Sequence, residues 1–499
     1  MTAHRPFNKI LVANRGEIAI RIMRACQELG IPTVAVYSEA DKDALHVQFA
    51  DEAVLLGEAA PRESYLNVDK LIHAARQTNA DAIHPGYGFL SENASFAAAV
   101  ASAKLTFIGP SADSIRAMGD KAESKITMKR AGVPTVPGFE GLESYEDFRQ
   151  AASEIGYPVL VKAAAGGGGK GMRVVEGEAD LAEAIQGARR EALNAFEDER
   201  LLVEKYLPDA HHIEFQVLGD QHGNLVHLFE RECSVQRRHQ KIIEETPSPL
   251  LSPELRWQMG EAAVKAARAV DYFNAGTVEF IFDPTLSRFY FLEMNTRLQV
   301  EHPVTELVVG LDLVQWQIRI AAGEKFPFSQ SDFSQRGHAI ECRVYAEDPA
   351  DRFLPSTGKL LQFIEPRGLG IRVDSGFLAG KDVTHFYDPL LAKLIVHAEN
   401  RETAIQRMQA ALRGFVVHGV TTNIDFMQAL LAHEDFKNGK VTTHWVETKF
   451  DWRPAKLTFE ALVAASLADF SVSSVGSQVS SADEPDPYNP WKAVSGFRN

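Results

Sequence analysis

Two neighbouring stretches of the chain, residues 277–282 and 288–295, alternate between apolar and polar side chains in the manner of strands. In the first stretch, Glu279 lies on the face opposite the Val and Phe side chains. In the second, the alternation predicts one face shared by Phe289, Phe291, Glu293 and Asn295. Because only residues 283–287 join the stretches, we expect a β-hairpin in which Glu279 and Glu293 lie almost opposite each other.

Short apolar runs separated by helical patterns occupy the first 110 residues. The runs at 10–13, 31–37, 54–56 and 81–84 are typical of buried parallel strands, and residues 17–28 have helical periodicity. This order of strand, helix and strand predicts a doubly wound sheet. The dinucleotide-binding fingerprint Gly-x-Gly-x-x-Gly is absent from the segment.

A glycine-rich segment, residues 166–171, lies between predicted strands at 157–162 and 172–175. A glycine loop that opens a helix would be a P-loop, whereas one between strands is typical of a flap over phosphates. The Walker spacing also fails, since Ala164 occupies the position of its first glycine. A flexible linker would look similar, but the flanking strands and Lys162 favour the flap.

Residues 231–241 form a dense polar and basic run, which predicts a loop between core strands. Such a run is often a solvated face, but its position favours a phosphate or substrate role. The neighbouring residues His211 and His212 should point to opposite faces of a strand, which argues against a shared metal ion. The strand predicted at 338–345 begins a further α+β unit, and a helix at 456–468 precedes a Ser- and Pro-rich segment.

The composition describes a globular protein of two to four domains, with 499 residues, 45% of them hydrophobic and 24% charged. A net charge of −15 argues against nonspecific binding to nucleic acids or anionic membranes. Three widely spaced cysteines fit neither a disulfide framework nor a zinc site. No secretory signal is evident, and no apolar run approaches the roughly 20 residues that span a bilayer. We therefore expect a cytoplasmic protein.

The segment 293–302 carries the strongest candidate chemistry. Two carboxylates and an amide, from Glu279, Glu293 and Asn295, are hard oxygen ligands that suit Mg²⁺ or Mn²⁺. The alternative is a solvated strand face. Arg297 offers a planar fork for an oxyanion, and Glu301 is placed to take a proton beside it. Metal, anion clamp and base together predict the activation of a small acid by ATP.

Six motifs jointly resemble biotin carboxylase, the ATP-grasp component of biotin-dependent carboxylases. The resemblance covers about residues 5–448 and rests on ANRGEIAIR at 13–21, HPGYGFLSEN at 84–93, MGDK at 118–121, GGGGKGMRVV at 166–175, ECSVQRRHQK at 232–241 and EMNTRLQVEH at 293–302. The last two separate this family from carbamoyl-phosphate synthases and D-alanine ligases, which share the grasp fold.

The resemblance implies an ATP-grasp fold that combines α/β and α+β parts. We expect a doubly wound N-terminal domain at 1–117, an ATP-grasp domain at 118–334 with a mobile lid at about 135–205, and a C-terminal α+β domain at 335–450. Residues 451–499 would add a helix and a tail.

Site residues follow from the same motifs. The resemblance implies that ATP is bound by Lys121, Lys162, Gly168, Gly169, Glu204, Lys205, Leu207, His212, Gln236, His239, Glu279 and Glu293. It implies metal ligation by Glu279, Glu293 and Asn295, with two ions expected. Bicarbonate and biotin would be bound by Lys241, Arg297, Gln299, Val300, Arg343 and Tyr87. Lys241, Arg297, Glu301 and Arg343 would be catalytic, Glu301 as the base for bicarbonate and Arg343 as the cation that stabilises the biotin enolate.

The implied reaction joins bicarbonate to ATP as carboxyphosphate and then carboxylates biotin. The implied partners are a biotin carboxyl carrier protein, carboxyltransferase subunits and a second copy of the chain. We expect an acetyl-CoA or other acyl-CoA carboxylase of fatty acid biosynthesis, or else the biotin carboxylase part of a longer propionyl-CoA, methylcrotonyl-CoA or pyruvate carboxylase subunit.

The sequence contains no Ala-Met-Lys-Met biotinylation site. Biotin would therefore arrive on another polypeptide, or the chain is a fragment that ends before a carrier domain. Two rival functions are a grasp ligase that joins a carboxylate to an amine, and a silent ATP-binding regulatory subunit. A silent subunit should have lost ligands, whereas Glu279, Glu293, Asn295, Arg297, Glu301 and Arg343 are all present.

Overall fold

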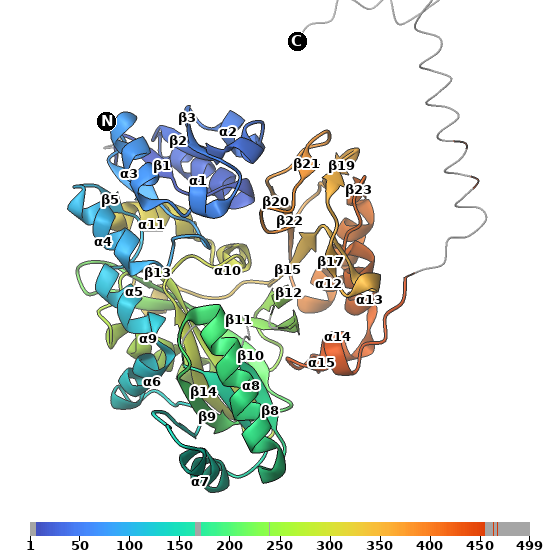
Figure 1. Ribbon diagram of the computed structural model, residues 1–499. Helices are drawn as coiled ribbons and strands as arrows, with labels where there is room; N and C mark the ends of the chain where they lie inside the picture. Colours follow the sequence, from blue (N-terminus) through green and yellow to red (C-terminus); the bar gives the residue numbers. More distant parts are fainter. Residues whose placement is uncertain (1–5, 165–170, 239, 455–462, 464–466, 468–499) are drawn as a thin grey trace, which may run out of the picture. The chain divides into compact units, whose positions relative to one another are not determined.

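The computed structural model describes residues 6–164, 171–238 and 240–454, together with Val463 and Leu467. Met1–Trp452 forms one compact unit, to which all the elements below belong (Figure 1). The flap residues Gly168 and Gly169, the predicted ATP ligand His239, the Ser- and Pro-rich tail and nearly all of the helix predicted at 456–468 lie outside the described residues.

A five-stranded parallel sheet opens the chain in the order β3-β2-β1-β4-β5. Ile10 and Val12 of β1 pack with α1 on one face, while Leu11 packs with α3 and α4 on the other. Helices on both faces confirm the predicted doubly wound arrangement. The elements are β1 (Ile10–Val12), α1 (Gly16–Glu28), β2 (Thr33–Ser38), α2 (Leu45–Phe49), β3 (Glu52–Gly57), α3 (Val68–Gln77), β4 (Ala82–His84), α4 (Ala94–Ser102), β5 (Thr106–Phe107), α5 (Ala112–Gly119) and α6 (Lys121–Arg130).

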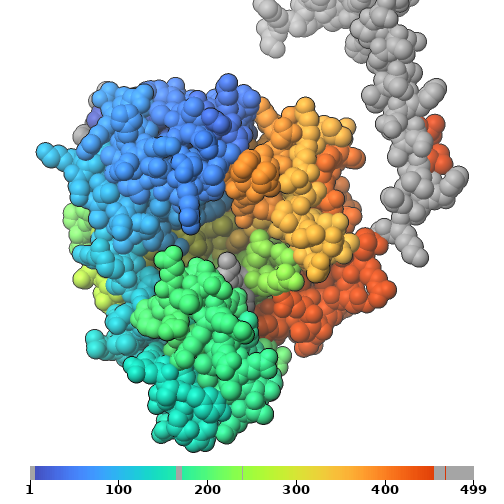
Figure 2. Space-filling model, in the orientation of Figure 1, coloured from blue at the N-terminus to red at the C-terminus, as the bar shows by residue number. Residues whose placement is uncertain are grey.

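A four-stranded antiparallel sheet, in the order β6-β9-β7-β8, follows with two helices packed on it. Its residues, coloured teal to green, form a lobe that projects from the rest of the unit (Figure 2). The elements are β6 (Gly138–Phe139), α7 (Tyr145–Ile155), β7 (Val159–Ala163), β8 (Met172–Val175), α8 (Glu178–Phe196) and β9 (Leu201–Lys205).

An eight-stranded antiparallel sheet forms the centre of the molecule, in the order β14-β13-β10-β11-β12-β15-β22-β20. Val278, Phe280 and Phe282 of β13 pack against α9 on one face, so the other face carries Glu279. The elements are β10 (His211–Gly219), β11 (Leu225–Arg237), β12 (Gln240–Thr246), α9 (Pro253–Arg268), β13 (Asn274–Asp283), β14 (Arg288–Asn295), α10 (His302–Val309), α11 (Leu313–Ala321), β15 (His338–Tyr345), β20 (Ile371–Ser375) and β22 (Leu390–Ala398).

The predicted hairpin is confirmed, because Glu279 lies directly opposite Glu293. The uniform alternation expected in the second strand is wrong. The register shifts between Glu279 and Phe280, so that Leu292 is an extra residue. This bulge turns Phe291 into the core while Glu293 stays on the polar face.

The loop predicted at residues 231–241 is also wrong, since β11 extends to Arg237 and β12 begins at Gln240. The alternation was hidden because buried positions of β11 carry charged residues, among them Arg231 and Glu232. These charges are paired inside the protein instead of facing water.

The central sheet continues into the C-terminal part of the chain, since β15 is hydrogen-bonded to β12 and then to β22. The strand predicted at 338–345 therefore adds to an existing sheet, and helices α12 and α13 cover its apolar face. The remaining elements are α12 (Arg401–Gly414), α13 (Ile424–Ala432), α14 (Glu434–Lys437), α15 (Trp445–Thr448), and the short strands β16 (Glu347–Asp348), β17 (Leu354–Pro355), β18 (Gly358–Lys359), β19 (Gln362–Ile364), β21 (Asp382–Val383) and β23 (Val416–His418). Among the described residues, no helix combines the length and apolar character needed to cross a membrane.

Candidate active site

A pocket of about 710 Å³ lies between the four-stranded lobe and the central sheet. Every described residue that the sequence singled out lines it, except Glu301 and Tyr87. The lining residues of that set are Lys121, Lys162, Glu204, Lys205, Leu207, His212, Gln236, Lys241, Glu279, Glu293, Asn295, Arg297, Gln299, Val300 and Arg343. One cavity thus brings together Lys121 and Arg343, which are 222 positions apart in the sequence.

Apolar side chains line the pocket from both the lobe and the central sheet, where a purine base would fit: Val136, Leu160, Met172, Ile281 and Leu292. Sequence reasoning missed this apolar lining. It also missed Thr443 and His444, whose ring lies 5.8 Å from that of Tyr206. Of these residues only Met172 lies in a motif, the one at 166–175.

Two lysines of the lobe are held by neighbouring groups of the protein. Lys162 Nζ lies 2.6 Å from Glu204, which also pairs with Lys125. Burial would raise the pKa of Glu204, but the charges of Lys162 and Lys125 outweigh burial and hold the pKa at about 2. Lys205 Nζ donates to the carbonyl oxygen of Gly156 at 2.9 Å.

A row of four charged residues crosses the polar face of the central sheet in register. Arg231 of β11 lies opposite Glu214 of β10, Glu214 lies opposite Glu279 of β13, and Glu279 lies opposite Glu293 of β14. Like charges in such positions repel unless cations lie between them. Lys241 supplies one cation, since its Nζ lies 2.5 Å from Glu214 and 3.0 Å from Glu279.

The outer carboxylates of the row fit the predicted divalent cation. Glu279 and Glu293 both line the pocket, and the nearest lysine to Glu293, Lys121, stays 3.6 Å away. Asn295 lies beside them, but its amide nitrogen faces Glu279 at 2.9 Å, so the amide would have to turn over to offer its oxygen. His212 also pairs with Glu279 at 2.8 Å. Two carboxylates and an amide are a donor set that suits Mg²⁺ or Mn²⁺.

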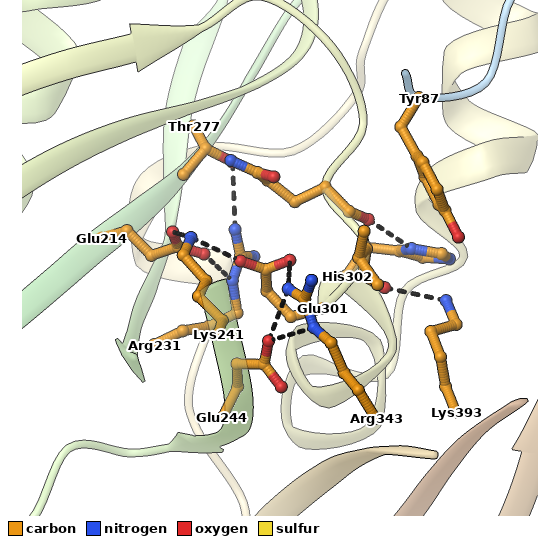
Figure 3. A network of polar contacts seen from close by, with 12 residues as sticks. Tyr87, Glu214, Arg231, Lys241, Glu244, Thr277, Glu301, His302, Arg343 and Lys393 are labelled. Carbon is orange, nitrogen blue, oxygen red and sulfur yellow. Dashed lines mark hydrogen bonds and ion pairs between the residues drawn. The ribbon is translucent and has the colours of Figure 1, made fainter. Parts of the chain in front are cut away.

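Glu301 lies at the centre of a buried cluster of charges (Figure 3). Lys241 Nζ is 2.6 Å from one carboxylate oxygen, and an Nη of Arg343 is 3.0 Å from the other. Burial would raise the pKa of Glu301, but Lys241, Arg343 and Arg231 together hold it well below its usual value. Glu301 is therefore a carboxylate at neutral pH.

Two further carboxylates, which sequence reasoning missed, complete this cluster. Glu214 accepts from Arg231 Nε at 2.5 Å, and Glu244 accepts from Arg343 Nε at 2.6 Å. Burial is the main reason that the pKa of Glu244 rises to about 7, against the opposing charge of Arg343. No local pattern in the sequence marks either residue as part of this cluster.

The guanidinium of Arg297 is held on three sides. Its nitrogens donate to Glu92 at 2.8 Å, to Gln299 at 2.7 Å and to Asn295 at 3.0 Å. Glu92 also accepts from the backbone nitrogen of Thr296 at 3.0 Å. Sequence reasoning missed Glu92, although it lies within the motif at 84–93.

Tyr87 is placed apart from the other predicted residues. It does not line the pocket, and its hydroxyl donates to the carboxylate of Glu17 on α1. Tyr87 and Lys393 both lie on the His302 side of the charged cluster, away from Glu214 and Arg231 (Figure 3).

Comparison with known proteins accounts for this geometry. Models of the biotin carboxylase N-terminal domain, the carbamoyl-phosphate synthase L chain ATP-binding domain and the biotin carboxylase C-terminal domain match residues 6–115, 120–328 and 341–448. Biotin carboxylase 1 of Bacillus subtilis is 54% identical over 441 residues, which cover 88% of this chain and 98% of that protein. The chain belongs to the biotin carboxylase family.

Other biotin carboxylase relatives are parts of larger enzymes. The alpha subunit of mitochondrial methylcrotonoyl-CoA carboxylase from Dictyostelium discoideum is 49% identical over 498 residues, or 99% of this chain and 71% of that subunit. The biotin carboxylase domain dimer of Hydrogenobacter thermophilus 2-oxoglutarate carboxylase, solved with MgADP and bicarbonate, gives a TM-score of 0.87 at 50% identity. The alignment covers 90% of this chain and 100% of the Hydrogenobacter domain.

These findings confirm the predicted biotin carboxylase family, the ATP-grasp fold and the class of ATP-dependent ligase. The predicted domain limits and the roles of individual residues stay predictions.

Proposed function

We propose that this chain uses ATP and bicarbonate to carboxylate biotin on a carrier protein, through carboxyphosphate. The observation that carries the proposal is the position of Glu301, which is fully buried and bonded to both Lys241 and Arg343. Both cations line the pocket in which the nucleotide-binding and anion-binding residues meet. A carboxylate base beside two fixed cations suits an anionic substrate that must lose a proton before it reacts.

Glu301 is proposed to accept the proton of the bicarbonate hydroxyl. The freed oxygen then forms a bond to the γ-phosphorus of ATP while the bond to the β-phosphate oxygen breaks, which yields carboxyphosphate and ADP. Lys241, Arg297 and Gln299 would hold the bicarbonate. Lys241 also balances the charge of Glu301, and the low pKa of Glu301 keeps the base unprotonated at neutral pH.

Lys121 and Lys162 are proposed to contact the ATP phosphates from two sides of the pocket. Glu279, Glu293 and Asn295 would hold a divalent cation, which would offset the negative charge of the phosphates when bound. The apolar lining at Leu160 and Met172 would accept the adenine ring.

Arg343 is proposed to stabilise the enolate that forms on the biotin ureido oxygen. Two carboxylates, Glu244 and Glu301, fix its guanidinium at bonding distances of 2.6 and 3.0 Å. Burial would lower the pKa of Arg343, but the charges of Glu244 and Glu301 outweigh burial and raise it well above its usual value, so the side chain is always charged. A fixed cation that needs no reorganisation is what a developing oxyanion requires.

For the acyl acceptor we propose acetyl-CoA, with fatty acid synthesis as the setting and a separate carrier and carboxyltransferase as partners. A role in a longer methylcrotonyl-CoA-type subunit is the second candidate, favoured by the alignment of 99% of this chain with the Dictyostelium subunit. We also propose a homodimer, as for the Hydrogenobacter relative solved as a dimer. A cytoplasmic location remains a prediction.

Isotopically labelled bicarbonate tests the proposed function. Purified chain, MgATP, free biotin and labelled bicarbonate should give biotin that carries one labelled carboxyl group, detected by mass spectrometry after methyl ester trapping. Omission of ATP is the control and should abolish the label. Labelled product without ATP, or none with it, would contradict the proposal.

A further inference from the structure

Lys393 of β22 is a fully buried lysine for which the proposed reaction gives no role. It lies opposite Arg343 on β15 and opposite Asp374 on β20. A buried ammonium loses its hydration and persists only where partners replace it. The groups that contact the Lys393 ammonium therefore indicate its role.

The ammonium of Lys393 contacts two regions that the active site needs. Its Nζ donates to the backbone oxygen of Val300 at 2.8 Å and lies 3.3 Å from Glu17. The carboxylate oxygen of Glu17 that faces Lys393 is the same one that accepts the Tyr87 hydroxyl. The ammonium also lies 6.0 Å from the centre of the Tyr87 ring.

Lys393 thereby joins the segment that carries Val300 and Glu301 to the loop that carries Tyr87. Val300 lines the pocket, whereas Tyr87 lies outside it. We propose that Lys393 is a positioning residue, which holds Tyr87 through Glu17 and holds Val300 directly, so that both flank the biotin ureido ring. This inference rests on the proposed function and adds a residue for the biotin step.

Charge neutralisation alone does not explain these contacts. Asp374, 3.8 Å from Lys393, is already bonded to Arg372 at 3.0 and 2.7 Å. Glu341 also feels the charge of Lys393, but burial raises the pKa of Glu341 well above its usual value, and among the described residues its carboxyl oxygens have no hydrogen-bond partner. The shortest contact of Lys393 is to an uncharged carbonyl. Burial raises the pKa of Glu17, and Lys393 is the largest opposing influence, so Lys393 favours the ionised form of Glu17 that accepts from Tyr87.

The test compares Lys393→Met, Glu17→Gln and a control, Arg372→Met. Arg372 is a cation of the same buried network whose hydrogen bonds go to Asp374 and Glu306. Three quantities are measured for each protein: the KM for free biotin, bicarbonate-dependent phosphate release without biotin, and the melting temperature. Lys393→Arg, which keeps the charge, tests for rescue.

We expect Lys393→Met to raise the biotin KM by about tenfold or more, the usual consequence of breaking a buried charged hydrogen bond. Biotin-free phosphate release should stay within about twofold, because Lys241 and Arg343 still hold Glu301. Glu17→Gln should raise the biotin KM in the same sense, and Lys393→Arg should restore part of it. Arg372→Met should lower the melting temperature and leave the biotin KM unchanged.

Two results would overturn the inference. One is an unchanged biotin KM in both Lys393→Met and Glu17→Gln, while the wild-type protein responds to biotin. The other is a KM shift in Arg372→Met equal to that in Lys393→Met, which would make the effect one of general stability. Should Lys393→Met not fold, Glu17→Gln alone decides, since it keeps the lysine. A wild-type protein that ignores biotin altogether would overturn the proposed function as well.

Discussion

The two ends of the charged row across the central sheet differ in how completely they are satisfied. At one end the side chains of Arg231 and Glu214 are fully buried and bonded to each other at 2.5 Å. At the other end 37% of the Glu293 side chain is exposed, and its nearest lysine lies 3.6 Å away. Glu279, between them, is bonded to Lys241 and His212. Glutamates in register across one sheet thus differ: Glu214 belongs to a buried ion pair, whereas Glu293 is partly exposed.

The buried end is organised before any substrate binds. Each of its acids Glu214, Glu244 and Glu301 contacts at least one of the cations Arg231, Lys241 and Arg343. The open end instead holds Glu293 and Lys121 in a loose, partly exposed pair, which suits the proposed binding of a metal nucleotide. Preorganised charge favours catalysis at a reacting centre, whereas loosely paired charge at an open site favours ligand binding.

The largest effect is expected from Glu301→Gln. This substitution keeps the shape of the side chain but removes the base and the anion that Lys241 and Arg343 share. Phosphate release and biotin carboxylation should both fall by roughly 10²–10⁴, the usual contribution of a general base. Steady-state rates of the two reactions measure this. Unchanged phosphate release would remove Glu301 as the base.

The next largest effect, on stability, is expected when one cation of the buried end is removed. Arg231→Met would leave buried Glu214 with Lys241 as its remaining cation, and Thr277 and Thr305 would lose their donors. We expect the free energy of unfolding to fall by about 3–5 kcal/mol, as for other broken buried ion pairs. Urea denaturation monitored by circular dichroism measures it. A loss below about 1 kcal/mol would contradict a preorganised cluster.

The pH dependence of stability tests the pairing of Glu204 with Lys162 and Lys125. The pKa of Glu204 is about 2 in the folded protein and near 4.5 when unfolded, so its stabilising effect is full above pH 4.5 and is lost as pH falls through 2. The wild-type protein should exceed Glu204→Gln in unfolding free energy by roughly 3 kcal/mol at pH 7. This difference in unfolding free energy should become smaller when denaturation is repeated at lower pH. A difference independent of pH would contradict the pairing.

The smallest effect on stability is expected at the open end. Lys121→Met removes a partly exposed lysine, so the free energy of unfolding should change by less than about 1 kcal/mol. The KM for ATP should nevertheless rise by about tenfold, the equivalent of one charged contact to phosphate. Denaturation measures the free energy of unfolding, and ATP titration of the same preparation measures the KM. A stability loss as large as that of Arg231→Met would erase the difference between the two ends.

The sequence predicted the open end better than the buried one. Strand alternation was enough to place Glu279 opposite Glu293, because a short connection fixes the register of a hairpin. It could not show the bulge at Leu292, since bulges depend on packing with the neighbouring strand. The motifs supplied Arg297, but its partner Glu92 is 205 residues away in the chain.

The buried cluster was harder to predict because buried charges look like surface charges in a sequence. Arg231 and Lys241 lie in a run of polar residues that predicts a loop, yet both belong to strands. Glu214 and Glu244 could be assigned only once strand pairing brought them to these cations. Sheet order, which no local pattern specifies, decides which buried charges become partners.

The most direct test of the account is phosphate release from MgATP, with bicarbonate removed or added and with free biotin titrated. The account predicts release that requires bicarbonate and rises with biotin, because Glu301 can act only on a bound bicarbonate and Arg343 lies beside it. Release that is indifferent to both compounds would show that the charged cluster serves another reaction of the grasp fold.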